Sequence, residues 1–94
     1  MTVVRIEHSV PSFDKWKQAF DSDPADRKGS GVRRYRILRL QEQPDYVLID
    51  LEFDTLAEAE AFLYRMQRIW SGAGKAVMQN PTGRVAEMVE EREL

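Results

Sequence analysis

The sequence predicts an α+β fold in which two helices cover one face of a four-stranded antiparallel sheet, and three observations lead to it. Residues 46–53 (YVLIDLEF) alternate between apolar and mixed side chains, with the period of two typical of a β-strand. A helix start signal, TLAE at 55–58, follows at once. The other segments complete the order strand, helix, strand, strand, helix, strand, which is the order of a ferredoxin-like sheet.

The first half of the chain contains one strand and one helix. Residues 3–10 alternate, with Val4, Ile6, His8 and Val10 on one face, and Pro11 ends this strand. The next residue, a serine, predicts a helix N-cap, and apolar side chains recur after it at helical spacing up to the Asp-Pro pair at 23–24. Residues 26–31 contain two glycines and predict a connecting loop.

The second half begins with a strand at residues 32–41, which carries arginines at positions 33, 34, 36 and 39. The segment 41–45 predicts a hairpin turn into residues 46–53. Thr55 and Glu58 then predict a capping box, in which each side chain satisfies a backbone amide at the start of a helix that runs to Trp70. After a break at 71–74, residues 75–79 predict an extra turn, and the last strand runs from 84 to about 91.

The predicted topology leaves one sheet face uncovered. The first and third strands are central, the second and fourth are edges, and both helices lie on the same side. Such a surface is either in contact with water or buried against a second copy of the chain. The arginine-rich second strand and the glutamate-rich fourth strand have complementary charge, which favours a homodimer, although edge charges also serve to prevent aggregation in monomers. The residues expected in this dimer interface are Arg5, Glu7, Asp50 and Glu52.

Composition narrows the classes of function. Its length of 94 residues predicts a single domain, 1–94, with a thin core. The net charge of −2 argues against nucleic acid, and one histidine with no cysteine argues against a metal site. The chain lacks a membrane-spanning apolar run and a signal peptide, so we expect a cytoplasmic protein.

Four segments carry a resemblance to known proteins: HSVPSFDKWKQAF (8–20), GVRRYR (31–36), YVLIDLEF (46–53) and EAEAF (58–62). Together they resemble small bacterial proteins of the dimeric α+β barrel superfamily, which includes antibiotic-biosynthesis monooxygenase-like proteins and uncharacterised cyclase-like proteins. The resemblance implies a homodimer whose sheets form a barrel, with a small-molecule pocket between helices and sheet. It also implies chemistry without a cofactor on aromatic polyketides. Haem degradation in related proteins uses a first-strand Asn and a second-helix His, and this chain has neither.

Three residues are candidates for catalysis. The side chain of His8 points towards the helices, where a neutral imidazole is suited to act as a general base, although a lone histidine at a strand end is more often structural. Tyr35 is suited to donate a hydrogen bond to a ligand oxygen, or is simply amphipathic at an edge. An arginine of the same strand, Arg36, would polarise that oxygen, but the sequence does not decide which of the arginines at 33, 34, 36 and 39 face the helices.

The inner faces of the two helices provide large apolar side chains. They are suited to line a flat aromatic site, and the same spacing is what core packing requires. These residues are Trp16, Phe20, Phe62, Met66 and Trp70. Two hypotheses follow: a cofactor-independent monooxygenase or cyclase-like enzyme acting on an aromatic or polyketide-like molecule, or a non-catalytic homodimeric ligand-binding or interaction module.

Overall fold

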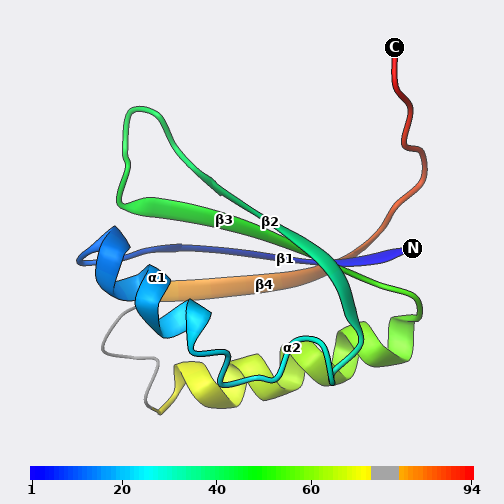
Figure 1. The fold of residues 1–94 in the computed structure, drawn as a ribbon, viewed down its shortest axis with the longest axis horizontal. Helices are drawn as coiled ribbons and strands as arrows, with labels where there is room; N and C mark the ends of the chain where they lie inside the picture. Colours follow the sequence, from blue (N-terminus) through cyan, green and yellow to red (C-terminus); the bar gives the residue numbers. More distant parts are fainter. Residues whose placement is uncertain (73–78) are drawn as a thin grey trace.

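The computed structural model describes residues 1–72 and 79–94 and contains one sheet and two helices (Figure 1). Most of the extra turn predicted at 75–79 lies outside the described residues, and Gln79 belongs to the last strand. The elements are β1 (Thr2–Ser9), α1 (Phe13–Asp21), β2 (Val32–Arg39), β3 (Tyr46–Phe53), α2 (Leu56–Trp70) and β4 (Gln79–Glu87).

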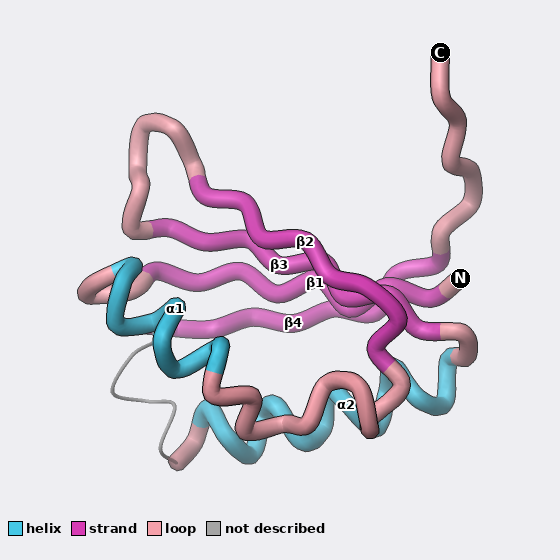
Figure 2. The backbone as a smooth tube through the Cα atoms, in the orientation of Figure 1, coloured by secondary structure: helices cyan, strands magenta, loops and turns pink. Residues whose placement is uncertain are grey.

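The four strands form an antiparallel sheet in the order β2-β3-β1-β4. The prediction that the first and third strands are central is therefore confirmed. Both helices lie on the same side of the sheet, with α2 running under its length and α1 under one end (Figures 1 and 2). This is the ferredoxin-like α+β fold that the element order predicts.

The core lies between the sheet and the helices. Alternate residues of the two central strands point into it and are almost fully buried, as the period of two predicts. The helices contribute Trp16, Ala59 and Phe62, each at most 3% exposed. The buried strand residues are Val4, Ile6, Val47, Ile49, Leu51 and Phe53.

Both helices begin at the predicted caps. Ser12 Oγ accepts a hydrogen bond from the Lys15 amide at 3.4 Å, and Thr55 Oγ1 accepts one from the Glu58 amide at 3.2 Å. The reciprocal half of the capping box differs from the prediction. The Glu58 carboxylate accepts a hydrogen bond from the Thr55 hydroxyl at 3.0 Å, not from the Thr55 backbone amide. The Thr55 hydroxyl therefore takes part in both bonds, as acceptor from the Glu58 amide and as donor to the Glu58 carboxylate.

The last strand begins five residues earlier and ends about four residues earlier than predicted, at Gln79 and Glu87. Pro81 lies within β4, and this is tolerated because β4 is an edge strand, where a missing amide hydrogen need not break the sheet. Opposite His8 the register shifts by one residue, and Asn80 adopts a positive φ of 50° at this bulge. The second strand is shorter than predicted and ends at Arg39 instead of residue 41.

No helix of the described residues covers the other sheet face (Figure 1). The β2–β3 hairpin loop and the C-terminal segment after β4 both project to this side, at opposite ends of the sheet (Figures 1 and 2). Val89 in that segment is 90% exposed, and the Met88 amide donates to the Met1 carbonyl at 2.9 Å. None of the helices in the described part of the chain is long and apolar enough to span a membrane.

Candidate functional site

His8 is the polar residue at the centre of the candidate site. It lies near the end of β1 on the helix face and is only 1% exposed. Its Nδ1 lies 3.2 Å from the Ser9 carbonyl oxygen, so the ring donates through Nδ1–H and leaves Nε2 with a free lone pair. Nε2 is buried and has no hydrogen-bond partner among the described residues. Burial lowers the pKa of His8, opposed by the bond to Ser9, and this favours the neutral base.

A row of aromatic rings leads from His8 to β2. The His8 and Trp16 rings meet edge to face with centroids 5.7 Å apart, and Trp16 packs against Phe13 at 5.7 Å and against Phe20 at 5.2 Å. Phe20 in turn meets Tyr35 of β2 at 5.2 Å. The structure therefore brings four predicted residues into one contact chain: His8, Trp16, Phe20 and Tyr35.

The predicted catalytic trio is not assembled within one chain. Tyr35 lies on the helix face and pairs with Leu51 of β3, whereas His8 pairs with Val47 of the same strand. Val47 and Leu51 are four residues apart, so Tyr35 and His8 are separated by about 13 Å along the strand direction. Arg36 pairs with Asp50 and points to the opposite face of the sheet. Neither side chain shares a row with His8.

The arginine of β2 that faces the helices near His8 is Arg39. It pairs with Val47, which is also the β3 partner of His8. Its guanidinium lies over the Phe13 ring, 4.5 Å from the centroid. The sequence alone did not single out Arg39, because the face of each β2 arginine depends on the pairing with β3 and on the register irregularity between Val32 and Arg34.

The predicted ligand residues of α2 pack mainly in the core. Phe62 is 2% exposed and stacks at a tilt on Phe53, with centroids 5.3 Å apart. Met66 is half-buried against the same cluster. Trp70 is half-buried, and its Nε1 has no partner among the described residues. Its ring lies against Gly83, where a Cβ would stand 3.1 Å from the Trp70 ring, so this position on β4 has to be small.

The four predicted interface residues all lie on the open sheet face. Arg5 donates to both carboxylate oxygens of Asp50, at 2.8 and 2.9 Å. Two of the residues expected in the interface, Arg5 and Asp50, are therefore paired with each other within one chain. This hydrogen bond lowers the pKa of Asp50. Glu7 accepts from the Tyr46 hydroxyl at 3.0 Å and so raises the pKa of Tyr46. Glu52 is 7% exposed.

Among the open depressions of the described part of the chain are two that do not include His8. One, of about 530 Å³, lies between the loop before β2 and the start of that strand, around Arg27 and Tyr35. The other, of about 440 Å³, lies where Val10 approaches the β2–β3 loop. Because His8 is only 1% exposed, a ligand would reach its Nε2 only after a covering side chain has moved.

Comparison with solved structures identifies the fold. SnoaB from Streptomyces nogalater, a cofactor-independent oxygenase, superimposes with a TM-score of 0.76 at 11% identity, over 96% of this chain and 94% of that one. An antibiotic biosynthesis monooxygenase superimposes with a TM-score of 0.68 at 13% identity, over 96% of this chain and 100% of that one. The chain has the fold of these proteins.

A third similar structure is a dimeric ferredoxin-like protein from an uncultured marine organism. It has a TM-score of 0.66 and 11% identity, over 99% of this chain and 98% of that one. No protein-family profile matches the sequence, and no curated protein sequence matches it. The resemblance seen in the sequence is thus confirmed for the fold.

Proposed function

We propose that this protein is a small homodimeric oxygenase that acts on an aromatic, polyketide-like molecule bound between α1 and the sheet. The observation that carries the proposal is the buried Nε2 of His8, which has no hydrogen-bond partner among residues 1–72 and 79–94. Buried polar atoms are almost always hydrogen-bonded, and leaving one unpaired costs about 1–3 kcal/mol. A ligand hydroxyl or an acidic C–H at this position would supply the missing partner.

The chemistry needs a base and a flat apolar surface, and both are present. Neutral His8 accepts a proton from an activated methylene of the substrate through Nε2, and the resulting carbanion adds O₂ to give a peroxide anion. Protonated His8 then returns the proton, which gives the hydroperoxide and restores the neutral base. The hydroperoxide then loses water and leaves a carbonyl, so that CH₂ and O₂ become C=O and H₂O. The substrate itself supplies the electrons. Trp16 and Phe20 provide ring faces against which the substrate stacks.

We infer a homodimer from the open sheet face. Arg5 and Asp50 are already paired within the chain, which reduces the cost of burying both charges against a second copy. The tail beyond β4 carries glutamates at 90, 91 and 93, and β2 carries exposed Arg34 and Arg36. These opposite charges suit contact between copies related by a two-fold axis. The solved dimeric ferredoxin-like structures have the same fold.

The test compares His8→Phe with the wild type, because phenylalanine keeps the ring contact with Trp16 and removes the base. With aromatic substrates that carry an activated methylene, we expect O₂ consumption to fall at least about 100-fold, while far-UV circular dichroism is unchanged. Tyr46→Phe on the open face is the matched control and should keep the wild-type rate. Equal rates in His8→Phe and the wild type would remove His8 from the chemistry.

The second candidate is a non-catalytic ligand-binding module. The close packing of His8 against Trp16 favours this function, because an enzyme that uses His8 as a base needs a cavity beside it. A histidine that only packs in the core does not. Binding of the same compounds without any O₂ consumption by the wild type would support this function instead of the oxygenase.

A further inference from the structure

We propose that the ligand of this site is an aromatic anion and that Arg39 binds its negatively charged oxygen group. The proposal rests on the function proposed above and deepens it by naming the substrate class. It starts from the register of the sheet. Arg39, Val47 and His8 form one transverse row on the helix face, one residue from each of three adjacent strands. Because neighbouring strands are about 4.8 Å apart, the Cα atoms of Arg39 and His8 are about 10 Å apart.

Arg39 differs in its partners from most arginines on and beside the sheet; Arg36, which also forms no ion pair with a described residue, lies on the opposite face. Arg5, Arg33, Arg34 and Arg84 each form an ion pair with Asp50, Asp54, Glu52 and Glu7, respectively. Arg39 has no hydrogen bond or ion pair with any described residue, and its contact is the face of Phe13. Its five N–H groups are therefore available to an incoming anion.

Arg27 provides the comparison that separates a structural arginine from a binding one. It also lies over an aromatic ring, 3.8 Å from the Phe20 centroid. However, Arg27 Nη1 donates to the Phe20 carbonyl at 2.6 Å, and its Nε lies 3.4 Å from Asp23. These bonds secure the loop after α1, so Arg27 is the structural residue of the two.

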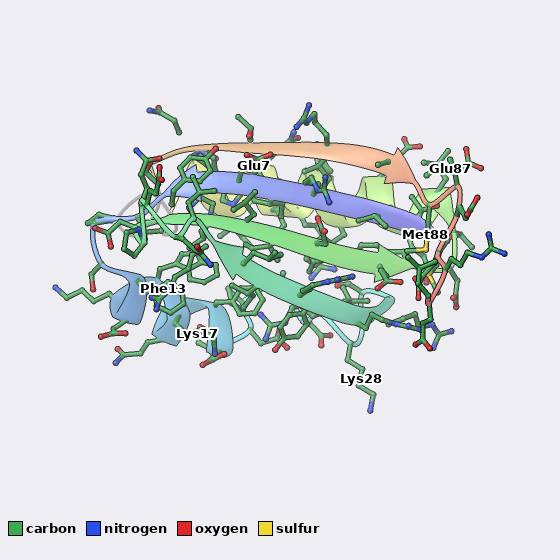
Figure 3. The ribbon with its side chains drawn as sticks, turned by 90° about the horizontal axis from the view of Figure 1, so that it is seen from above. Glu7, Phe13, Lys17, Lys28, Glu87 and Met88 are labelled. Carbon is green, nitrogen blue, oxygen red and sulfur yellow. The ribbon has the colours of Figure 1, made fainter. Side chains whose placement is uncertain are left out.

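The position of Arg39 decides how a ligand would lie. Phe13 sits on α1 beside the end of β2 that carries Arg39 (Figure 3). Arg39 is exposed, whereas His8 is buried, so the row runs from solvent into the core. A fused-ring aromatic in this row would place its carboxylate or enolate oxygen on the guanidinium and its reacting carbon towards Nε2. A guanidinium on a ring face is already poorly hydrated, and this strengthens a bidentate bond to a carboxylate.

The experiment compares two probes with the same two rings, 2-naphthoate and the neutral 2-naphthamide, by titration calorimetry and tryptophan fluorescence. The wild type should bind the naphthoate about tenfold more tightly than the amide. Arg39→Gln should bind both compounds about equally, and Arg39→Lys should keep part of the preference. Arg36→Gln is the matched control, since it makes the same change on the same strand but on the opposite face. It should keep the full preference.

The outcomes separate the possible failures. Loss of the contact with Phe13 alone would weaken both probes alike, so an unchanged preference in Arg39→Gln would overturn the proposal and leave a packing role. Equal affinity of the wild type for the two probes would also overturn it, while the aromatic site and the role of His8 would stand. If neither probe binds the wild type, both the proposed aromatic ligand site and the proposed role of Arg39 are wrong.

Discussion

At the scale of single residues, His8 combines two properties that oppose each other. Its place on the helix face follows from the alternation of β1, and so it was predictable from sequence. The lack of a described hydrogen-bond partner for Nε2 was not predictable. It depends on the hydrogen bond from Nδ1–H to the Ser9 carbonyl and on the packing of Trp16 against the ring. The same burial that makes the imidazole a candidate base also makes its protonated form costly.

This burial predicts a pH dependence of stability. The pKa of His8 in the folded chain lies below the 6.5 of an unfolded chain, so the unfolded state binds more protons between the two values. The His8 contribution to the free energy of unfolding is therefore complete above about pH 6.5 and is lost as the pH falls through the folded pKa. The slope is at most about 1.4 kcal/mol per pH unit. Urea denaturation between about pH 5 and about pH 8 measures it.

His8→Gln is the control, because it should flatten the dependence in this window. Asp50 does not interfere, because its pKa is lowered from 3.8 and its contribution is lost only below that value. A wild-type slope that persists in His8→Gln would assign the effect to another group.

At the scale of elements, the sequence predicts the parts whose signal is local. β3 has the predicted bounds, and α2 starts and ends where its cap and apolar stripe place it. β4 was placed wrongly, because whether Pro81 breaks a strand depends on its being at the edge of the sheet. The face of each β2 arginine was undecided for a similar reason, since it depends on pairing with β3.

The cap of α2 gives a prediction at this scale. Thr55 holds the Glu58 amide and also donates to the Glu58 carboxylate, so Thr55→Ala loses both bonds. We expect a loss of about 1 kcal/mol in the free energy of unfolding, measured by urea denaturation. Thr55→Ser keeps the hydroxyl and should lose only a few tenths of a kcal/mol. A Thr55→Ala variant as stable as the wild type would show that the capping bonds contribute nothing in water.

At the scale of the whole molecule, the two faces of the sheet differ in the charged side chains that they carry. On the helix face, the described central-strand side chains are apolar except for His8 and for Thr2 at the start of β1. On the open face, charged side chains of both signs lie next to one another across the strands, as in the row Arg36, Asp50, Arg5 and Arg84. Apolar side chains lie between these charges, and Leu38 is 46% exposed. Paired charges with interspersed apolar groups suit a surface that is buried against a second copy with the same pattern.

This arrangement predicts a dimer that a single buried charge should separate. Leu48 lies on the open face opposite Glu7 of β1, so Leu48→Glu would place an unpaired carboxylate in the interface. Leaving such a charge unpaired costs several kcal/mol, which is comparable to the surplus that holds many dimers together. By light scattering at micromolar concentration we expect the wild type to be a dimer and Leu48→Glu a monomer of unchanged circular dichroism. Leu56→Glu makes the same change on the helix side, where Leu56 is 54% exposed, and should stay dimeric. A monomeric wild type, or a Leu48→Glu variant that still forms dimers, would mean that the open face contacts water.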